Sequence, residues 1–347
     1  MSLCNVKERF AWLDALRVSA CFGVVALHVV APLLSSLPFT SIGWWTSNIV
    51  MSLISSCVLV FVLISGALFL TRPFHEDVGG FFGRRLSFVG QVSFWTVFYI
   101  LLRWMSEPEL TWGHLWNDLW RGVPYYHLWF LYMISGLYLI TPVLCWCIPK
   151  ITRSIRRFVV ISSLVLTCIM TMAGSLSSFL PCHNIVFLFL PFVPYFLLGY
   201  ELFIANISGK ITDKICLGVF LFTATTLSLV VFLCFSRNYQ GGLVAWLSGS
   251  FSPFTLVMAV CIFRFFHAVK DAKFLLLLAR LAPLTLGIYV LHPLFIRLLA
   301  HAGFPGSFVR VEFAVIVMIF AVFVWSALTV WAMSKVPYIR RLVITVR

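Results

Sequence analysis

Long apolar runs, separated by short polar segments, follow one another along the whole of this chain. A helix needs about 20 predominantly apolar residues to cross the hydrocarbon core of a bilayer. The runs that meet this length are 12–34, 48–70, 86–104, 127–148, 158–180, 184–204, 215–236, 244–266, 281–300 and 311–334. The pattern therefore predicts an all-α polytopic integral membrane protein with about ten transmembrane helices. We expect residues 1–347 to form a single transmembrane domain with no soluble domain.

The charges of the connecting segments alternate in a way that orients these helices. Every second connection carries a basic cluster, such as Arg84–Arg85, Arg153–Arg157 and Arg340–Arg341. The intervening connections hold scattered arginines together with four of the eleven acidic residues, among them Glu107 and Asp118. Because cytoplasmic loops carry an excess of Lys and Arg, the alternation places both termini in the cytoplasm.

Composition agrees with a membrane protein and argues against nucleic-acid binding. The chain is 62% hydrophobic and 10% charged, whereas soluble domains carry roughly 25% charged residues. The formal net charge is +14, but the basic residues lie in short clusters between apolar runs. That distribution is typical of inner-face loops that contact anionic membrane lipids. Cys145 and Cys147 form only a lone CxC pair, so we expect no metal site.

The first run contains three ionisable residues, Asp14, Arg17 and His28. Such residues are expensive inside a membrane, and a functional role is the default interpretation. Asp14 and Arg17 are three residues apart and can pair. Arg17 and His28 are eleven residues apart, so they lie on one helix face, about 16 Å apart along the axis. Histidine suits proton transfer near neutral pH; snorkelling of Arg17 and a structural His28 are the alternative.

Basic residues follow the second run on its predicted cytoplasmic side. Ser65 precedes a glycine near the end of the run, and Arg72, Arg84 and Arg85 come after it. Small residues usually mean close helix packing, and loop arginines usually mean orientation. The sharper hypothesis is a phosphate-bearing ligand held by arginine forks on the cytoplasmic side.

Two aromatic and histidine clusters lie in the fourth and ninth runs. Tyr126, His127 and Trp129 stand at the outer start of the fourth run, where they form either an interfacial aromatic belt or a platform for a sugar ring. Tyr289 and His292 share one face of the ninth run. Pro293 lacks the N–H that would bond the Tyr289 carbonyl, so it leaves that acceptor free.

These residues, taken in order, resemble the membrane-bound acyltransferase-3 family, which O-acetylates cell-surface glycans. The resemblance rests on the Asp14-x2-Arg17-x10-His28 pattern, the segment FVLISGALF with Ser65, and the arginines after it. HLWFL at 127–131, YFLLGYELF at 195–203 and LGIYVLHPLF at 286–295 match as well. The match covers nearly the whole chain, and is most similar to the subgroup that acetylates enterobacterial common antigen.

The resemblance implies a multi-pass enzyme of the bacterial inner membrane that uses acetyl-CoA as co-substrate. The acetyl group would pass from the cytoplasm to a sugar hydroxyl of a glycan or lipid-linked glycan precursor at the outer face. His28 would be the catalytic histidine, as general base or transient acyl carrier, with Arg17 orienting the thioester end or stabilising negative charge and Asp14 holding Arg17. Ser65, Arg72, Arg84 and Arg85 would bind the donor. Tyr126, His127, Trp129, Tyr289 and His292 would belong to the acceptor side.

Two other functions stay open at this point. A transporter or flippase of a lipid-linked sugar would also place charges and prolines inside the membrane. Against it, the sequence shows no pair of corresponding broken helices in its two halves. The second alternative is the same enzyme type with a succinyl donor.

Overall fold

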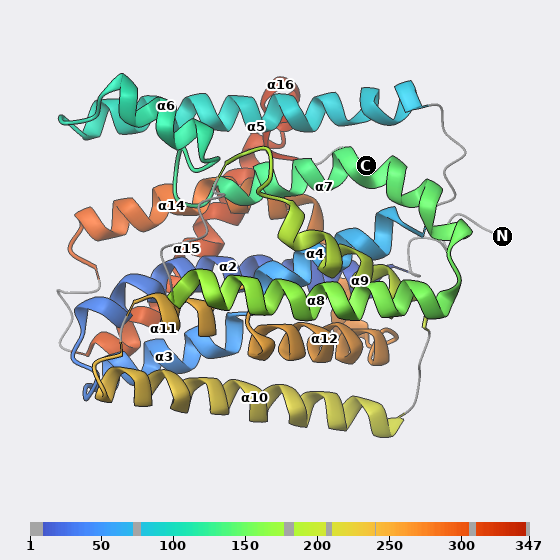
Figure 1. Ribbon diagram of the computed structural model, residues 1–347. Coiled ribbons are helices and arrows are strands. Elements are labelled where there is room, and N and C mark those ends of the chain that lie inside the picture. The colour runs from blue at the N-terminus through green and yellow to red at the C-terminus, as the bar shows by residue number, and fades with distance from the viewer. Residues whose placement is uncertain are drawn as a thin grey trace.

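The computed structural model describes residues 10–71, 78–176, 184–205, 210–239, 241–304 and 310–344. Within these ranges every regular element is a helix. Eight helical stretches are long and apolar enough to cross a membrane, and they lie roughly side by side (Figure 1). They are α2 (Ala11–Ser36), α3 with α4 (Ile42–Phe69), α5 (Val78–Ser106), α7 (Trp129–Cys147), α8 (Arg153–Leu176), α10 (Lys210–Ser236), α13 with α14 (Lys273–His301) and α15 (Val311–Met333).

Two shorter apolar helices complete the correspondence with the ten predicted runs. They are α9 (Val193–Ile204) and α12 (Pro253–Ala268). Each predicted run overlaps one of these ten helical stretches in the described residues, although residues 177–180 of the fifth run lie outside them. The class of fold, an all-helical polytopic membrane protein, is confirmed. The exact number of crossings and the cytoplasmic location of the termini stay predictions.

Helix α2 lies in the middle of the bundle. It packs against α3 (Ile42–Ile54), α4 (Cys57–Phe69), α12, α13 (Lys273–Ala279), α14 (Thr285–His301) and α15. Its apolar residues are buried all around the helix, including Leu16, Cys21 and Val25, as expected of a helix surrounded by others. Polar side chains on α2 therefore face other helices, which places the ionisable residues of the first run inside the bundle.

The second and eighth predicted runs are each interrupted by a short segment outside any helix. The second run is interrupted at Ser55–Ser56, between α3 and α4, and the eighth at 248–252, between α11 (Gly242–Leu247) and α12. The interruptions lie in the second and eighth of the ten runs, so the expectation that the two halves hold no corresponding pair of broken helices stays a prediction. Each break satisfies its polar groups locally: the Ser55 hydroxyl donates to the Ser52 carbonyl at 3.1 Å, and the Thr255 hydroxyl donates to the Gly249 carbonyl at 2.8 Å. Such pairing lets irregular backbone exist at membrane depth.

Helices α4 and α9 approach each other at two glycines. A Cβ atom at Gly66 would lie 1.8 Å from the Phe196 carbonyl oxygen, and one at Gly199 would lie 2.1 Å from the Leu63 carbonyl oxygen. Only glycine permits backbones to come so close. The Ser65–Gly66 notch read from the sequence thus serves helix packing at Gly66.

The short helix α6 (Trp112–Trp120) precedes the turn that carries Tyr126 and His127. Trp112, Trp116 and Trp120 are 75%, 71% and 55% exposed, whereas Leu115 on the opposite side is buried. The three tryptophans are four residues apart, so they share one face of the helix. Such a face suits the headgroup layer of a membrane.

Candidate active site

The polar stripe predicted on α2 is present. Arg17 Nη1 lies 3.6 Å from Oδ1 of Asp14, which precedes it by three residues on the same helix. The helix runs unbroken through both Arg17 and His28, so the two residues share a face and are separated by about 16 Å along the axis. Pro32 lacks the N–H that would bond the His28 carbonyl, so the backbone at His28 keeps a free acceptor.

His28 lies among the aromatic and histidine residues that the sequence singled out elsewhere. Its ring centroid is 4.9 Å from that of Tyr126 and 5.2 Å from that of His292. His127 in turn lies 5.4 Å from His292 and 5.5 Å from Tyr289. Three segments remote in sequence therefore meet at one place in the bundle.

The carbonyl freed by Pro293 has a defined partner. His292 Nδ1 lies 2.7 Å from the Tyr289 carbonyl oxygen. Because a carbonyl only accepts, Nδ1 carries the proton, and Nε2 of the neutral ring is left as an acceptor. The Tyr289 hydroxyl donates to the His127 carbonyl, and the Tyr99 hydroxyl donates to the Val290 carbonyl at 2.5 Å. These bonds join α14, α5 and the turn before α7.

His127 and His292 are fully buried. Among the described residues, both ring nitrogens of His127 and Nε2 of His292 have no hydrogen-bond partner. Leaving one buried polar atom unpaired costs about 1–3 kcal/mol, and folded proteins keep few such atoms. The cluster thus holds hydrogen-bonding groups that the fold itself does not use.

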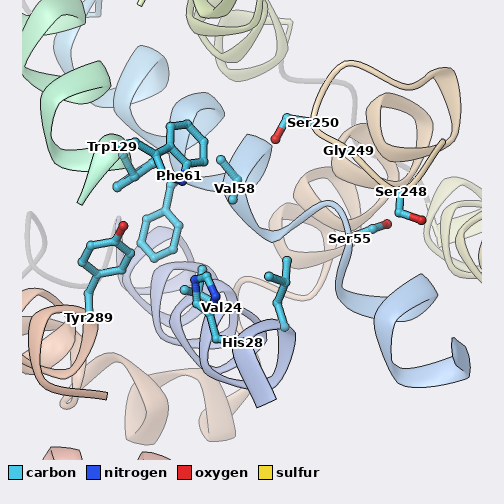
Figure 2. Close-up of a pocket in the computed structure, with 12 residues that line it drawn as sticks. Val24, His28, Ser55, Val58, Phe61, Trp129, Ser248, Gly249, Ser250 and Tyr289 are labelled. Atoms are coloured by element: carbon cyan, nitrogen blue, oxygen red, sulfur yellow. The ribbon is translucent and has the colours of Figure 1, made fainter. Parts of the chain in front are cut away.

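A cavity of about 140 Å³ opens beside His28. Figure 2 shows Tyr289, Trp129 and Phe61 on one side of it and Ser55, Ser248 and Ser250 on the other, with His28 between the two sides. Its remaining lining residues are Val24, Leu27, Val58, Phe130 and Gly249. Of the predicted site residues, His28, Trp129 and Tyr289 thus line one cavity. Tyr126 and His292 lie against the His28 ring outside this lining, and His127 lies against His292.

The serine side of the cavity was not predicted. Ser55, Ser248 and Ser250 lie at the two helix breaks, inside runs that looked continuous. The signals that could have found them are the Ser55–Ser56 pair and the segment SGSFSP at 248–253, which interrupt otherwise apolar sequence. Serines in a transmembrane run are common enough to be overlooked, because they often bond to their own helix.

Arg103 fixes the turn that carries Tyr126 and His127. Its guanidinium donates to Asp118 Oδ2 of α6 at 2.8 Å and to the Pro124 carbonyl at 2.9 Å, and it pairs with Glu107 at 3.1 Å. In the same turn, burial raises the pKa of the Tyr125 hydroxyl above its ordinary value, so this phenol stays protonated at neutral pH and can donate.

A buried arginine near the start of α2 was also missed. Arg264 of α12 is 8% exposed, and the neighbouring His267 places its ring centroid 5.1 Å from that of Trp12. An ionisable residue within an apolar run is itself a signal of function, and Arg264 lies inside the eighth predicted run. It adds a second arginine to the half of the bundle that holds Arg17.

The predicted donor residues are only partly within the described structure. Ser65 is half-buried on α4 and does not line the cavity beside His28. Arg72 lies outside the described residues, and so do the side chains of Arg84 and Arg85, whose backbone belongs to α5. Their assignment to the donor stays a prediction.

A helical membrane bundle with an ionisable stripe on its central helix and a cavity beside His28 defines the broad class, a polytopic membrane protein. Comparison with known families gives the particular class: the acyltransferase-3 family model, described as an acyltransferase domain, matches residues 10–334. The chain therefore belongs to this family and is a membrane acyltransferase. No curated protein and no solved structure matches the chain.

Proposed function

We propose that this protein is an O-acetyltransferase of the bacterial inner membrane. It moves an acetyl group from cytoplasmic acetyl-CoA to a sugar hydroxyl of a glycan or lipid-linked glycan precursor at the outer face. The observation that carries the proposal is the position of His28: it shares a helix face with Arg17 and borders a cavity with an aromatic side. The acceptor that we favour is enterobacterial common antigen, the glycan acetylated by the subgroup that the sequence resembles.

The proposed chemistry is a direct acyl transfer. His28 takes the proton from the acceptor hydroxyl, and the oxygen attacks the thioester carbonyl carbon. A C–O ester bond forms, the C–S bond breaks, and the proton returns from His28 to the thiolate of CoA. Tyr126 and His292 lie against the imidazole and hold its orientation, and His127 lies against His292.

Arg17 serves the donor at a distance from the reacting carbon. The separation of about 16 Å along α2 exceeds the reach of an arginine side chain, so Arg17 does not contact the acyl group next to His28. We infer that it binds the CoA arm nearer the nucleotide, held in place by Asp14. Ser65, Arg72, Arg84 and Arg85 remain the candidates for the rest of the donor.

The cavity favours acetyl over succinyl as the transferred group. Among the described residues that line it, none carries a guanidinium, ammonium or carboxylate group. A succinyl carboxylate beside His28 would be buried without a counter-ion, which is strongly unfavourable. The two helix breaks are a feature of transport proteins as well, but the family of the chain supports acyl transfer.

Transfer of radiolabel from [14C]acetyl-CoA by the purified protein in nanodiscs, with membrane glycolipid extract as acceptor, tests the proposal. His28→Ala should lower the rate about 10²- to 10⁴-fold, the usual contribution of a general base, at unchanged melting temperature. Equal turnover in both proteins would remove His28 from the chemistry. Wild-type protein that neither binds nor consumes acetyl-CoA, but moves lipid-linked sugar across vesicles, would replace the proposal with a flippase.

A further inference from the structure

The two helix breaks meet at the same cavity. Ser55 belongs to the break between α3 and α4, and Ser248 and Ser250 belong to the break between α11 and α12. Helices α4 and α12 pack directly against each other, which brings the breaks together although they are almost 200 residues apart in sequence. We call the three residues the serine wall; Figure 2 shows them on the opposite side of the cavity from Trp129, Phe61 and Tyr289.

The serine wall offers hydrogen-bonding capacity that the fold leaves unused. Ser55 donates its hydroxyl hydrogen to the Ser52 carbonyl, so its oxygen keeps lone pairs for a donor. Within the described part of the chain, the hydroxyls of Ser248 and Ser250 have no hydrogen-bond partner. The Gly249 carbonyl of the same break is already bonded to Thr255, which fixes the backbone beside the cavity.

The opposite side of the cavity is aromatic. Trp129, Phe130, Phe61 and Tyr289 present rings toward it. An amphipathic ring with apolar CH faces and a rim of hydroxyls fits between such walls, because its faces pack on aromatic rings while its hydroxyls bond to serine oxygens. Among the described residues that line it, no side chain is charged unless His28 is protonated, so a neutral sugar fits better than a uronic acid or a sugar phosphate.

We propose that the serine wall is the subsite that holds the hydroxyl groups of a neutral pyranose acceptor and directs one of them to His28. This inference rests on the proposed O-acetyl transfer and adds the residues that select the acceptor. At about 140 Å³ the cavity has the volume of roughly five water molecules. That is the scale of part or all of one sugar ring, and far below that of the nucleotide of CoA.

The chain contains a matched control within one break. Ser55 and Ser56 are adjacent, and each is 3% exposed, but only Ser55 lines the cavity. Ser56 makes no side-chain cap at the start of α4. Ser55→Ala and Ser56→Ala therefore remove the same atom from the same turn, and only the first removes it from the cavity. Ser250→Ala tests the other break.

The experiment uses inside-out membrane vesicles from source cells that lack the chromosomal copy and carry each variant, so that the native acceptor is present. Vesicles receive [14C]acetyl-CoA over a range of concentrations, and label in the glycan and glycolipid fractions is counted. We expect Ser55→Ala and Ser250→Ala to lower transfer at saturating acetyl-CoA about three- to tenfold, as for one lost hydrogen bond, with the KM for acetyl-CoA unchanged. Ser56→Ala should match wild type.

Each other outcome overturns a distinct statement. Ser55→Ala and Ser250→Ala variants that transfer as well as Ser56→Ala would show that the serine wall does not contact the acceptor. A KM for acetyl-CoA that rises in both would assign the wall to the donor instead. Wild-type vesicles that place no label in any fraction would refute the proposed O-acetyl transfer itself, and the failure of the two proposals is thereby distinguished.

Discussion

The imidazole of His292 lies against that of His28, with ring centroids 5.2 Å apart and planes inclined by 25°. The His292 ring is held from behind, because its Nδ1 donates to the Tyr289 carbonyl at 2.7 Å. That carbonyl is free only because Pro293 cannot donate to it. Pro293 thus fixes the tautomer and orientation of the His292 ring, which packs against the proposed catalytic residue His28.

Two substitutions test the roles of Nδ1 and Nε2 of His292 one at a time. In His292→Asn the amide nitrogen takes the place of Nδ1 and keeps the bond to the Tyr289 carbonyl, whereas in His292→Gln a polar group takes the place of Nε2. We expect Asn to preserve the melting temperature better and Gln to preserve more of the acetyl transfer, with roughly a tenfold loss for Asn. Both quantities, with the pH profile of transfer, are measured on protein in nanodiscs.

Which of the two variants keeps more transfer activity decides between a structural and a positioning role of His292. If Asn surpasses Gln in both stability and transfer, His292 only supports the fold. If the pH profile of transfer is the same in wild type and both variants, His292 has no influence on the proton that His28 handles.

Pro293→Ala supplies the N–H that the Tyr289 carbonyl lacks. The new helical bond competes with His292 Nδ1, so the His292 ring loses its fixed orientation. We expect transfer to fall several-fold while the melting temperature stays equal or rises, because proline inside a helix costs about 3 kcal/mol. Pro142→Ala in α7 makes the same change outside the histidine cluster and should leave transfer unaltered. Equal transfer in both variants would contradict the role of Pro293.

The contact between α4 and α9 predicts a strong effect of adding one methyl group. Gly66→Ala and Gly199→Ala place Cβ atoms 1.8 Å and 2.1 Å from backbone carbonyl oxygens, and the helices must separate. We expect a loss of at least 1–3 kcal/mol in the free energy of unfolding, as for an overpacked core, seen as a lower melting temperature in detergent.

Gly218 provides the control for these two variants. It lies inside α10, and nothing is within 4 Å of an added Cβ atom. Gly218→Ala should be neutral or stabilising by about 1 kcal/mol, because alanine favours the helix. Equal melting temperatures of Gly66→Ala, Gly199→Ala and Gly218→Ala would show that α4 and α9 lie farther apart than described.

Arg103 should affect the acceptor side alone. Arg103→Gln removes its ion pairs with Glu107 and Asp118 and weakens the hold on the Pro124 carbonyl, so the turn with Tyr126 and His127 becomes mobile. We expect a several-fold loss of transfer with an unchanged KM for acetyl-CoA. The exposed Arg121 in the same region offers Arg121→Gln as a control with the same charge change. Equal losses of transfer in the two variants would mean that positive charge at the outer face matters, and that the bonds by which Arg103 holds the turn do not.

The helical class, the stripe on α2 and the free carbonyl at Tyr289 could be read from the sequence. Each depends on interactions between residues close along the chain: apolar runs set by bilayer thickness, the turn of a single helix that aligns Arg17 with His28, and the missing N–H of Pro293. Such features need no knowledge of which helices are neighbours.

Only the tertiary structure decided what faces His28. The contact with His292, the burial of His127 and the meeting of Ser55 with Ser250 join segments far apart in sequence, and helix packing in a membrane leaves no periodic signal of partner choice. The breaks at Ser55–Ser56 and 248–252 were hidden for a different reason. Their backbone groups are satisfied within the bundle, so the surrounding sequence stays as apolar as a continuous helix requires.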